Sequence, residues 1–406
     1  MEKVGKIKGM KSFLFNRSRR KALLAVDFGS ESVKSLAFGK ENGKILIFGH
    51  SIHYFENPEI FGRAALAEEF VKTAISNSIN DLKRQNNKEL DGVILGLPSS
   101  ILKARIFCET YERGKSPKKI SGKEEKNIYG LVIEQAKKNI SRIYAEDHGI
   151  MPQDIHFIVL KISGIKIDGY EVEKISGFSG ETIEFKFVAT FLPKHYLEIF
   201  ERIFNQLGLK ILRITHEIEL LPDIISNTAS DGIFIDLGGD ITQIFLVRKG
   251  ELEKFEEVNV GGRIFSRIIS QTLGISDDEA RIIKEKYTNK ELSEEGRRKL
   301  KEIISRDLQN WFDNLKLKLF KNKKFLPSQI FIFGGGSRML GVEDILTDGD
   351  WGSNPLSEDP VLAEPYFSFI SNPKAKPISP FDIKKNIDII KGLNNPQFTP
   401  VFLQIK

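Results

Sequence analysis

The sequence contains few of the residues that build disulfides and metal centres. Its 406 residues include a single cysteine, Cys108, which excludes a disulfide framework and any multi-cysteine metal site and is typical of a reducing compartment. The six histidines form no His-Glu-x-x-His pair. No apolar run reaches the length of a membrane-spanning helix, and the basic start lacks the apolar stretch and small-residue cleavage site of a signal peptide. A hydrophobic fraction of 40% and a charged fraction of 29% are typical of a globular chain, here long enough for several modules.

An excess of positive charge is confined to the amino terminus. Residues 1–21 hold eight basic residues and one acidic residue, a net charge of +7, which leaves −1 for the remainder of a chain whose formal total is +6. A pI of about 9.0 would suggest nucleic acid as a partner, but the body of the chain has no excess of positive charge. We therefore expect no nucleic-acid binding.

Two interpretations stay open for the basic leader. Val4, Ile7, Met10 and Leu14 recur at helical spacing among lysines, so residues 1–21 suit the surface of an anionic membrane, where each basic residue adds about 1 kcal/mol. Two glycines in the same stretch each weaken a helix by about 1 kcal/mol, which favours a disordered basic arm instead.

The hydrophobic pattern predicts two sets of strands, each followed by helices. The first set opens with a short apolar run that ends in Asp-Phe-Gly, and the second begins at Gly232. The expected strands are 23–28, 32–38, 44–48, 91–98, the two halves of 233–247, 256–260, 329–333 and 398–404; the expected helices are 64–85, 264–273 and the charged region 276–320.

Residues 99–205 differ in sequence pattern from the regions on either side, and we predict that they form a compact α+β module inserted into a larger domain. Ser121 and Glu124 have the spacing of a capping box that opens a helix through Ile140. A polar loop precedes this helix, and three strands and a closing helix follow it. These elements are the loop 112–122, the strands 155–162, 169–174 and 181–191, and the helix 195–207.

An internal repeat relates the two strand sets. Val-Asp-Phe-Gly-Ser-Glu-Ser-Val-Lys at 26–34 is similar to Ile-Asp-Leu-Gly-Gly-Asp-Ile-Thr-Gln at 235–243. Both segments are a strand that ends in Asp-x-Gly and continues through a polar β-turn. The repeat predicts two similar half-domains that face each other.

Each repeated turn carries the groups that bind phosphate and its metal ion. Gly29 lacks a Cβ atom, so backbone amides can approach a phosphate, while Ser30 and Ser32 add hydroxyl donors. Asp27 suits Mg²⁺, which prefers hard oxygen ligands and keeps several of its waters. The second turn repeats this design with Asp236, Gly238, Gly239, Asp240 and Thr242. An ordinary β-turn explains one such segment as well, but the pair favours a phosphate clamp.

A third glycine segment, Gly334-Gly335-Gly336-Ser337, follows the strand 329–333. Glycines at a strand-to-helix junction let the backbone pass beside a base or a phosphate. The segment is neither a Walker loop nor a G-x-G-x-x-G motif, and by itself it also fits a plain tight turn.

The order Asp-x-Gly-Ser, Asp-x-Gly-Gly-x-x-Thr and Gly-Gly-Gly-Ser resembles the two phosphate motifs and the adenosine motif of the actin-like ATPase superfamily. The inserted block is similar to the extra domain of the bacterial cell-division family FtsA. Ile167-Asp168-Gly169 and Ser176-Gly177-Phe178-Ser179-Gly180 match that family's Val-Asp-Gly and Pro-x-Gly-x-x-Gly. Residues 258–270 and 394–404 also resemble FtsA segments, so the resemblance covers about residues 22–404.

The resemblance implies an α/β, actin-like two-lobed fold of duplicated ribonuclease-H-like halves with an inserted α+β domain. It implies five segments: a basic leader at 1–21, a first half at 22–98 and 206–230, the inserted domain at 99–205, a second half at 231–262 and 328–406, and a helical subdomain at 263–327.

The resemblance also implies ATP and Mg²⁺ as ligands, with the metal ion at Asp27 and Asp236. The implied nucleotide contacts are Asp27, Gly29, Ser30, Ser32, Lys34, Asp236, Gly238, Gly239, Asp240, Thr242, Gly261, Gly262, Lys284, Gly334, Gly335, Gly336 and Ser337.

The chain departs from the family at the ribose and at the catalytic position. Lys284 of the family's Ala-Glu-x-x-Lys motif is kept, but Arg281 replaces the glutamate expected at the ribose, and Glu279 stands outside the motif. Glu217 is the candidate for positioning the attacking water, with Glu219 as the second choice. No strong general base stands out, so we expect slow ATP hydrolysis or none.

The implied function is an ATP-binding cytoskeletal protein of cell division. Such a protein would polymerise into actin-like filaments, act at the cytoplasmic face of the membrane through residues 1–21, and bind the carboxyl-terminal peptide of FtsZ and other divisome proteins. The FtsZ site would lie on the helical subdomain, whose apolar stripe also fits ordinary core packing. Two alternatives stay open: a PilM-like scaffold of type IV pilus assembly, and a sugar-kinase-like phosphotransferase.

Overall fold

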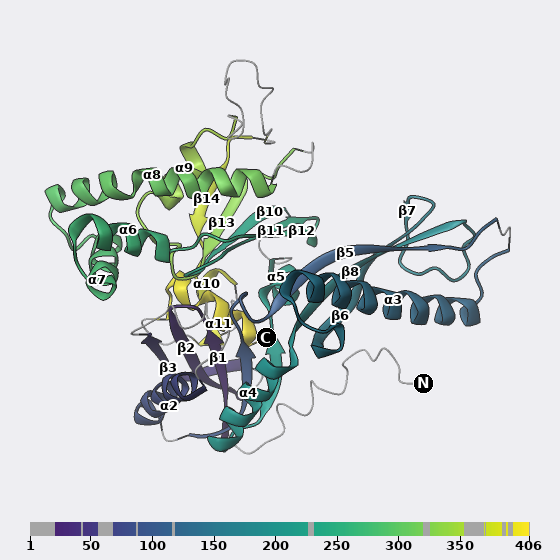
Figure 1. Ribbon diagram of the computed structural model, residues 1–406, viewed down its shortest axis with the longest axis horizontal. Coiled ribbons are helices and arrows are strands. Elements are labelled where there is room, and N and C mark those ends of the chain that lie inside the picture. Colours follow the sequence, from purple (N-terminus) through teal and green to yellow (C-terminus); the bar gives the residue numbers. More distant parts are fainter. Residues whose placement is uncertain are drawn as a thin grey trace. The chain divides into compact units, whose positions relative to one another are not determined.

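The computed structural model forms two compact units (Figure 1). The inserted unit comprises residues 97–204, and the flanking unit comprises the chain before and after it. Residues 1–20, which contain almost all of the basic leader, lie outside the described residues. The structure describes residues 21–41, 44–55, 68–86, 88–115, 118–225, 231–319, 325–352, 369, 371–383, 387–388 and 393–405. Within these ranges, no helix combines the length and the hydropathy that crossing a bilayer requires.

The first half of the flanking unit is a six-stranded sheet in the order β15-β3-β2-β1-β4-β9. Strands β1, β2 and β3 form the predicted antiparallel meander, and β4, then β9, continue the sheet in parallel. The element bounds are β1 Lys21–Phe28, β2 Ser32–Glu41, β3 Lys44–Tyr54, α2 Glu68–Gln85, β4 Glu89–Gly96, β9 Ile211–Thr215, α5 Glu217–Ile225 and β15 Ile387–Asp388. Because helices cover both faces of this sheet, β1 is apolar almost throughout.

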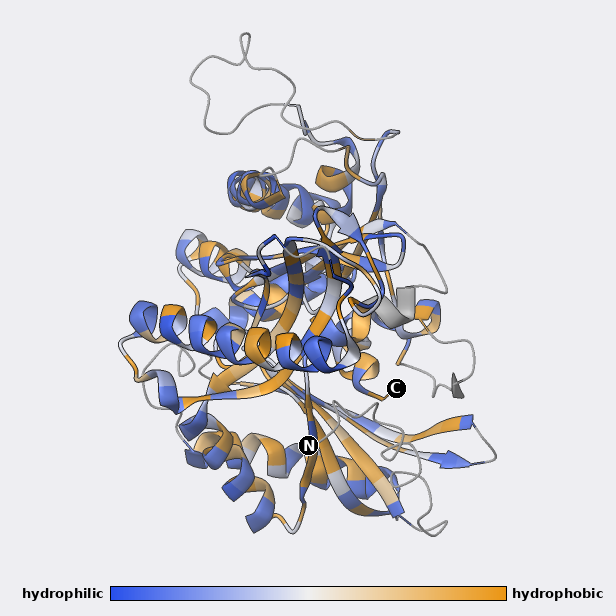
Figure 2. Cartoon of the chain, turned by 90° about the vertical axis from the view of Figure 1, so that its right-hand side faces the viewer, coloured by the Kyte–Doolittle hydropathy of each residue, from blue (hydrophilic) through white to orange (hydrophobic). Residues whose placement is uncertain are grey.

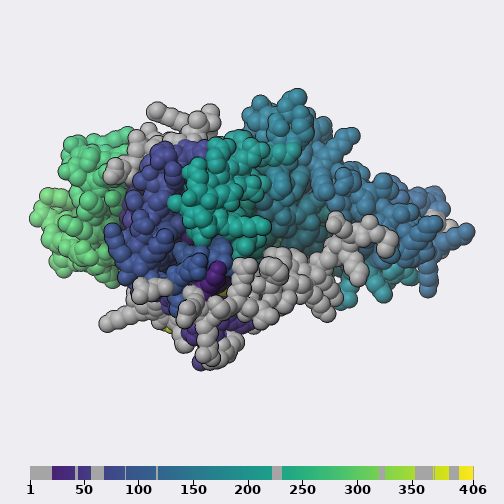
Figure 3. Space-filling model, turned by 90° about the horizontal axis from the view of Figure 1, so that it is seen from below, coloured from purple at the N-terminus to yellow at the C-terminus, as the bar shows by residue number. Residues whose placement is uncertain are grey.

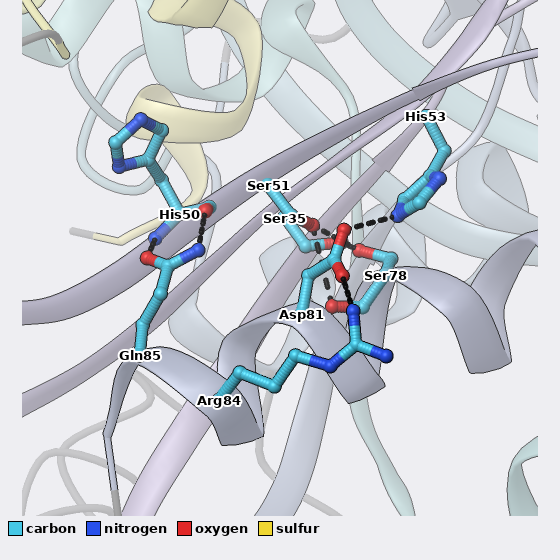
Figure 4. Close-up of polar contacts among 8 residues, drawn as sticks. All are labelled: Ser35, His50, Ser51, His53, Ser78, Asp81, Arg84 and Gln85. Atoms are coloured by element: carbon cyan, nitrogen blue, oxygen red, sulfur yellow. Dashed lines mark hydrogen bonds and ion pairs between the residues drawn. The ribbon is translucent and has the colours of Figure 1, made fainter.

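Helix α2 covers one face of the first sheet and is tied to it by buried hydroxyl groups (Figure 4). Ser51 Oγ lies 2.5 Å from Ser78 Oγ, which donates to Ser35 Oγ at 2.7 Å. His53 Nε2 contacts Asp81 Oδ2 at 2.7 Å nearer the surface. These serines bond to one another rather than to a histidine, so this Ser-His-Asp cluster holds a helix in place and is not a nucleophilic triad. The opposite side of α2 is part of the molecular surface (Figure 3).

The second half is a five-stranded sheet in the order β12-β11-β10-β13-β14, with helices packed against it. Trp311 and Phe312 of α8 are fully buried in this core, and the outward-facing sides of the helices are hydrophilic (Figure 2). The element bounds are β10 Gly232–Leu237, β11 Thr242–Arg248, β12 Glu251–Val258, α6 Arg263–Leu273, α7 Asp277–Thr288, α8 Glu294–Leu319, β13 Gln329–Phe333, α9 Val342–Asp348, β14 Lys374–Pro377 and α10 Pro380–Ile383.

The internal repeat is visible in the register of the two sheets. In the first hairpin (β1 and β2), Asp27 pairs with Lys34, and in the second hairpin (β10 and β11), Asp236 pairs with Gln243. Each Asp-bearing strand also has a parallel neighbour on its other side, β4 for β1 and β13 for β10. The predicted duplication is therefore confirmed down to the residue opposite each aspartate.

The closing segment differs from its prediction. Residues 398–404, expected as a strand, instead form the end of a 3₁₀ turn, Pro396–Phe398, and the helix α11, Thr399–Gln404. An apolar run buried on all sides has no period that separates strand from helix, whereas Pro396 and Pro400 stand at helix-starting positions.

Helix α11 also lies in a different half from the one expected. Val401 and Phe402 pack on Ala25, Leu36 and Phe38 of the first sheet. Residues 387–388, which pair with β3, and residues 393–405 thus belong structurally to the first half, whereas the resemblance placed residues 328–406 in the second.

The inserted unit is a four-stranded sheet, β5-β8-β6-β7, with the long helix α3 packed on it. The strand β5 was not predicted, because polar and charged residues interrupt its apolar pattern. The element bounds are β5 Lys103–Glu112, α3 Gly122–His148, η2 Pro152–Asp154, β6 Ile155–Ile167, β7 Tyr170–Glu171, β8 Thr182–Pro193 and α4 Lys194–Gln206.

Helix α3 begins where predicted but is capped on one side only. The Ser121 side chain accepts a hydrogen bond from the Glu124 amide. The Glu124 carboxylate binds the Arg113 guanidinium at 2.7 Å rather than returning to the cap, and this pairing lowers the pKa of Glu124. The helix continues to His148, where Gly149 adopts a left-handed conformation and ends it.

The Asp168-Gly169 and Gly180 motifs serve the packing of the inserted unit. Asp168 has φ 48°, and its carboxylate accepts hydrogen bonds from the amides of Glu181 and Thr182. This tight turn brings the backbone of Gly180 against Ile167 and Asp168. The geometry explains both motifs without a ligand.

We expect Gly180→Ala to destabilise the inserted unit by about 2–3 kcal/mol, because the new Cβ atom would overlap Ile167 Cγ2 in a buried turn. Hydrogen exchange of β8 measures this effect locally. Gly164→Ala is the matched control, since its Cβ would make only an ordinary contact, 3.7 Å from Lys186 Cβ. Equal protection of β8 in both variants would contradict the packing role.

Candidate functional site

The tips of the two hairpins touch each other across the gap between the halves. The Asp240 amide donates a hydrogen bond to Ser30 Oγ at 3.1 Å. A Cβ atom on Gly239 would lie 2.5 Å from Ser30 Oγ and 2.6 Å from Glu31 Cγ, so only glycine permits this approach. The two turns that sequence analysis paired therefore meet at one place in the structure.

Asp27 is neutralised within its own hairpin. It is buried, and its Oδ2 atom lies 3.2 Å from Nζ of Lys34, which is also buried. Lys34 stands directly opposite Asp27 on β2. At the equivalent place in the second hairpin stands Gln243, which carries no charge. The two hairpins thus place a lysine opposite Asp27 but an uncharged glutamine opposite Asp236.

Asp236 is the uncompensated member of the pair. Its Oδ1 atom is buried and has no hydrogen-bond partner among the described residues. Burial, together with the negative charge of Asp27, raises the pKa of Asp236 to about 7, and the charge of Lys34 opposes this rise only in part. A carboxylate in this state gains most from a cation arriving from outside.

Glu217, the candidate catalytic residue, belongs to the same cluster. It begins α5 directly after β9. Burial, then the charges of Asp236 and Asp27, raise the pKa of Glu217 well above its ordinary value. Glu219, the second choice, lies 3.5 Å from the Arg213 guanidinium. Glu217 is thus electrostatically linked to the aspartates of both hairpins, and its catalytic role stays a prediction.

His216 is a buried neighbour that sequence analysis did not single out. Burial lowers the pKa of His216 to about 3, so the ring is neutral. Its Nδ1 atom accepts a hydrogen bond from the Ile218 amide at 3.1 Å, and its Nε2 atom lies 3.2 Å from Gln243 Nε2. The neutral ring adds no positive charge to the carboxylate cluster.

Several predicted glycines allow backbone segments of the second half to pack on one another. The Gly262 amide donates to the Gly238 carbonyl at 2.8 Å, and a Cβ on Gly261 would overlap the Gly239 carbonyl. Gly334 has φ 88°, and its Cβ would overlap Asp236 Oδ1. The third glycine segment thus lies directly on the uncompensated aspartate.

The remaining glycines play different parts. Gly29 and Gly238 close equivalent turns by donating to the carbonyls of Ser32 and Ile241. The Gly336 amide donates to Leu237 O at 2.9 Å. Gly335 faces open space, and it alone of the triplet would meet nothing if it carried a side chain.

Three predicted nucleotide contacts are already used within the protein. Thr242 Oγ1 donates to Val260 O at 2.6 Å and accepts from Trp311 Nε1 at 2.9 Å. Ser337 Oγ donates to Gly334 O at 2.8 Å, and Lys284 Nζ donates to Gly262 O at 3.1 Å. The fully buried Thr242 hydroxyl has both its bonds made, so we assign it a structural role.

The ribose position holds arginine and tyrosine instead of a carboxylate. Arg281 pairs with Glu285 at 3.1 Å and stacks on the ring of Tyr54, with 4.5 Å from its Cζ atom to the ring centroid. Burial, then the Glu285 charge, raise the pKa of Tyr54. Glu279 caps α7 through Ser276. Arg281 has no carboxylate, and the carboxylate of Glu279 is used in the helix cap with Ser276. Neither residue therefore offers a free carboxylate to a ribose.

The cluster fits a magnesium ion bound largely through its waters. Among the residues that the structure describes, no three His, Cys, Asp or Glu side chains are close enough to hold a metal ion directly. Mg²⁺ needs only one or two protein carboxylates when phosphates supply other ligands. The unpartnered Asp236 Oδ1 and the shared negative charge of the cluster suit such an ion.

The two sheets and the paired hairpins give the chain an actin-like ATPase fold. No protein-family model matches the chain. Among solved structures, the PilM–PilN type IV pilus biogenesis complex aligns with a TM-score of 0.65 at 16% identity, covering 95% of this chain and 98% of that chain. The ethanolamine utilization protein EutJ from Carboxydothermus hydrogenoformans aligns with a TM-score of 0.51 at 11% identity, covering 97% and 93%. The expected actin-like fold is confirmed.

In sequence the chain shows a distant similarity to FtsA proteins. It is 23% identical over 351 residues to the cell division protein FtsA of Enterococcus faecalis, a match that spans 79% of this chain and 75% of the relative. Sequence thus points to FtsA, while the structural likeness includes PilM.

Proposed function

We propose that this protein binds Mg-ATP between its two hairpins as an actin-like cytoskeletal protein of the FtsA kind. The observation that carries the proposal is the buried cluster of Asp27, Asp236 and Glu217, three carboxylates with one lysine among them. A buried excess of negative charge is unfavourable unless a cation enters, and a metal-bound triphosphate brings one.

Each residue of the cluster and its turns is proposed to have a separate role in binding the metal ion, the phosphates or a water molecule. Asp27 and Asp236 would hold Mg²⁺ through its waters, and the turn amides near Gly29 and Gly238 would face the phosphates. Bound Mg²⁺ supplies charge neutralisation for the phosphates. Glu217 would orient a water molecule by hydrogen bonding. Because its raised pKa disfavours the carboxylate form, less of Glu217 is available to act as a base when no cation is bound, which supports slow hydrolysis or none.

The nucleotide then acts mainly on conformation. ATP contacts both halves at once, so it binds the closed arrangement more tightly than an open one and favours it. In the FtsA-like role, the closed form would assemble into filaments that link FtsZ, through its carboxyl-terminal peptide, and other divisome proteins to the inner face of the cytoplasmic membrane. The membrane contact proposed for residues 1–21 lies outside the described residues.

The Mg-ATP proposal is tested by calorimetry at several pH values. A cation binds the deprotonated carboxylate, and the pKa of Asp236 lies at about 7. Affinity for Mg-ATP should therefore rise about tenfold between about pH 6 and pH 8, with proton release on binding. ATP with EDTA is the control and should bind weakly at every pH. An affinity that does not change with pH would contradict the role of Asp236.

A PilM-like scaffold is the second candidate, favoured by the alignment that spans 98% of the chain in the PilM–PilN complex. Pull-downs with two peptides separate the candidates: the FtsZ carboxyl-terminal peptide, and an amino-terminal peptide of the pilus partner. Retention of the FtsZ peptide alone supports the division role, and retention of the pilus peptide alone overturns it. Binding of neither peptide would reject both partner assignments while leaving nucleotide binding to its own test.

A further inference from the structure

Arg263 contacts the turns of both hairpins and so joins the two halves of the flanking unit. Its Nη2 atom donates to the Ser30 carbonyl at 2.7 Å, and its Nη1 atom binds Asp240 Oδ1 at 2.6 Å. Its Nε atom lies 3.6 Å from Glu31 Oε1. Ser30 and Glu31 belong to the turn of the first hairpin and Asp240 to that of the second. One guanidinium thus spans both turns.

The base of this side chain is anchored on the second half. The Arg263 amide donates to the Gly239 carbonyl at 2.8 Å, and Arg263 begins α6. Because the backbone is fixed there, the guanidinium can reach Ser30 and Glu31 only when the first hairpin is close. The contacts of Arg263 with Ser30 and Glu31 therefore form only when the two halves are close, and they stabilise that closed arrangement.

The setting makes these contacts stronger than ordinary surface pairs. The Arg263 side chain is only 16% exposed. A planar guanidinium that binds a carbonyl and a carboxylate through separate N–H groups is held in one geometry, and burial weakens competition from water. Removing the guanidinium would take away the cation that contacts both Asp240 and Glu31.

A second arginine bridges the halves at another place. Arg281 of α7 stacks on Tyr54, which ends β3 of the first half, and Glu285 of α7 adds a hydrogen bond to the same tyrosine. This contact reinforces the closed arrangement. Its exposure is greater, since Tyr54 is 38% exposed. Arg263, which contacts the tips of both hairpins, is the less exposed of the two arginines, with 16% of its side chain exposed against 22% for Arg281.

We propose that Arg263 is a positioning residue that latches the two halves closed before any nucleotide is bound. The inference goes beyond nucleotide binding, because every contact in the latch is made by the protein itself. It assigns a role to a residue that none of the phosphate, adenosine or ribose motifs contains.

The test measures the distance between the halves in nucleotide-free protein. Spin labels are placed at two exposed positions, Lys83→Cys on α2 and Lys301→Cys on α8, in a Cys108→Ser background. The parent should give one narrow distance distribution. Arg263→Ala should give a broader distribution with a longer mean distance. Arg263→Lys keeps the positive charge but loses the branched guanidinium, so its distribution should fall between those of the parent and Arg263→Ala.

Arg142→Ala is the matched control, because it removes an arginine whose side chain is 60% exposed and which pairs with Glu146 across one helical turn. It should leave the distance unchanged. A folded Arg263→Ala protein with the parent's distribution would overturn the proposal. If Arg263→Ala does not fold, Glu31→Gln decides: a longer mean supports the latch and an unchanged distribution overturns it. No nucleotide is present, so a failure of ATP binding would leave this test unaffected.

Discussion

Asp236→Asn is expected to weaken Mg-ATP binding by at least about 100-fold while making the nucleotide-free protein more stable. The amide keeps the size of the carboxylate but removes a charge that the protein itself does not neutralise. The gain in the free energy of unfolding at pH 8 should be about 1–2 kcal/mol, discounted for the partial exposure of the residue. Calorimetry with Mg-ATP and urea unfolding measure the two effects.

The stability effect has a defined pH dependence. The pKa of Asp236 is raised from 3.8 to about 7, so between these values the native carboxyl keeps a proton that the unfolded chain has lost. Stability of the parent therefore falls as pH rises through this window, and the advantage of Asp236→Asn grows over the same range. Below about pH 4 the two proteins should be equally stable.

The control for this substitution is Asp348→Asn, the same change at an exposed position at the end of α9. It should alter neither binding nor stability appreciably. Unchanged Mg-ATP affinity in Asp236→Asn would refute the magnesium role of this residue. A loss of stability at pH 8 would show that the carboxylate has a native partner.

Gly334→Ala should destabilise the second half by about 3–5 kcal/mol and remove nucleotide binding with it. Two causes act together. The residue has φ 88°, a left-handed conformation that side chains disfavour, and its Cβ would overlap Asp236 Oδ1 and lie 2.9 Å from Leu237 O. The strand β13 places this turn directly over the second hairpin, so the backbone cannot move aside without disturbing Asp236.

Gly335→Ala, one residue further on, is the matched control. It introduces the same side chain into the same glycine triplet, but at a position with open space. It has no contact within 4 Å of a new Cβ and no positive φ, so it should change stability by less than about 0.5 kcal/mol. Thermal unfolding of the two variants measures the difference. Equal destabilisation, or a stable Gly334→Ala protein, would contradict the account of this turn.

The sequence predicted the site best where the chemistry is local. The turns after Asp27 and Asp236 and the glycine triplet were each identified from a few adjacent residues, and the repeat implied that the two turns face each other. Their convergence is confirmed by the contact between Ser30 and Asp240. The proposed nucleotide and metal roles of these residues stay predictions.

What the sequence could not predict depends on residues far apart along the chain. Arg263 is followed by an ordinary helix, and its contacts with Ser30 and Glu31 span more than two hundred positions. Thr242 matched a phosphate motif, but its partner Trp311 lies on a distant helix. The burial that sets the pKa of His216 also arises only when the halves are assembled.

Helix α11 has one more consequence. The polypeptide passes from the first half to the second after β9, and it returns after β14 so that α11 can cover Leu36 and Phe38. The polypeptide therefore connects the two halves covalently at two places. The lobes stay covalently joined when the bridge at the hairpin tips is released, and they cannot be produced as separate fragments by a single cut.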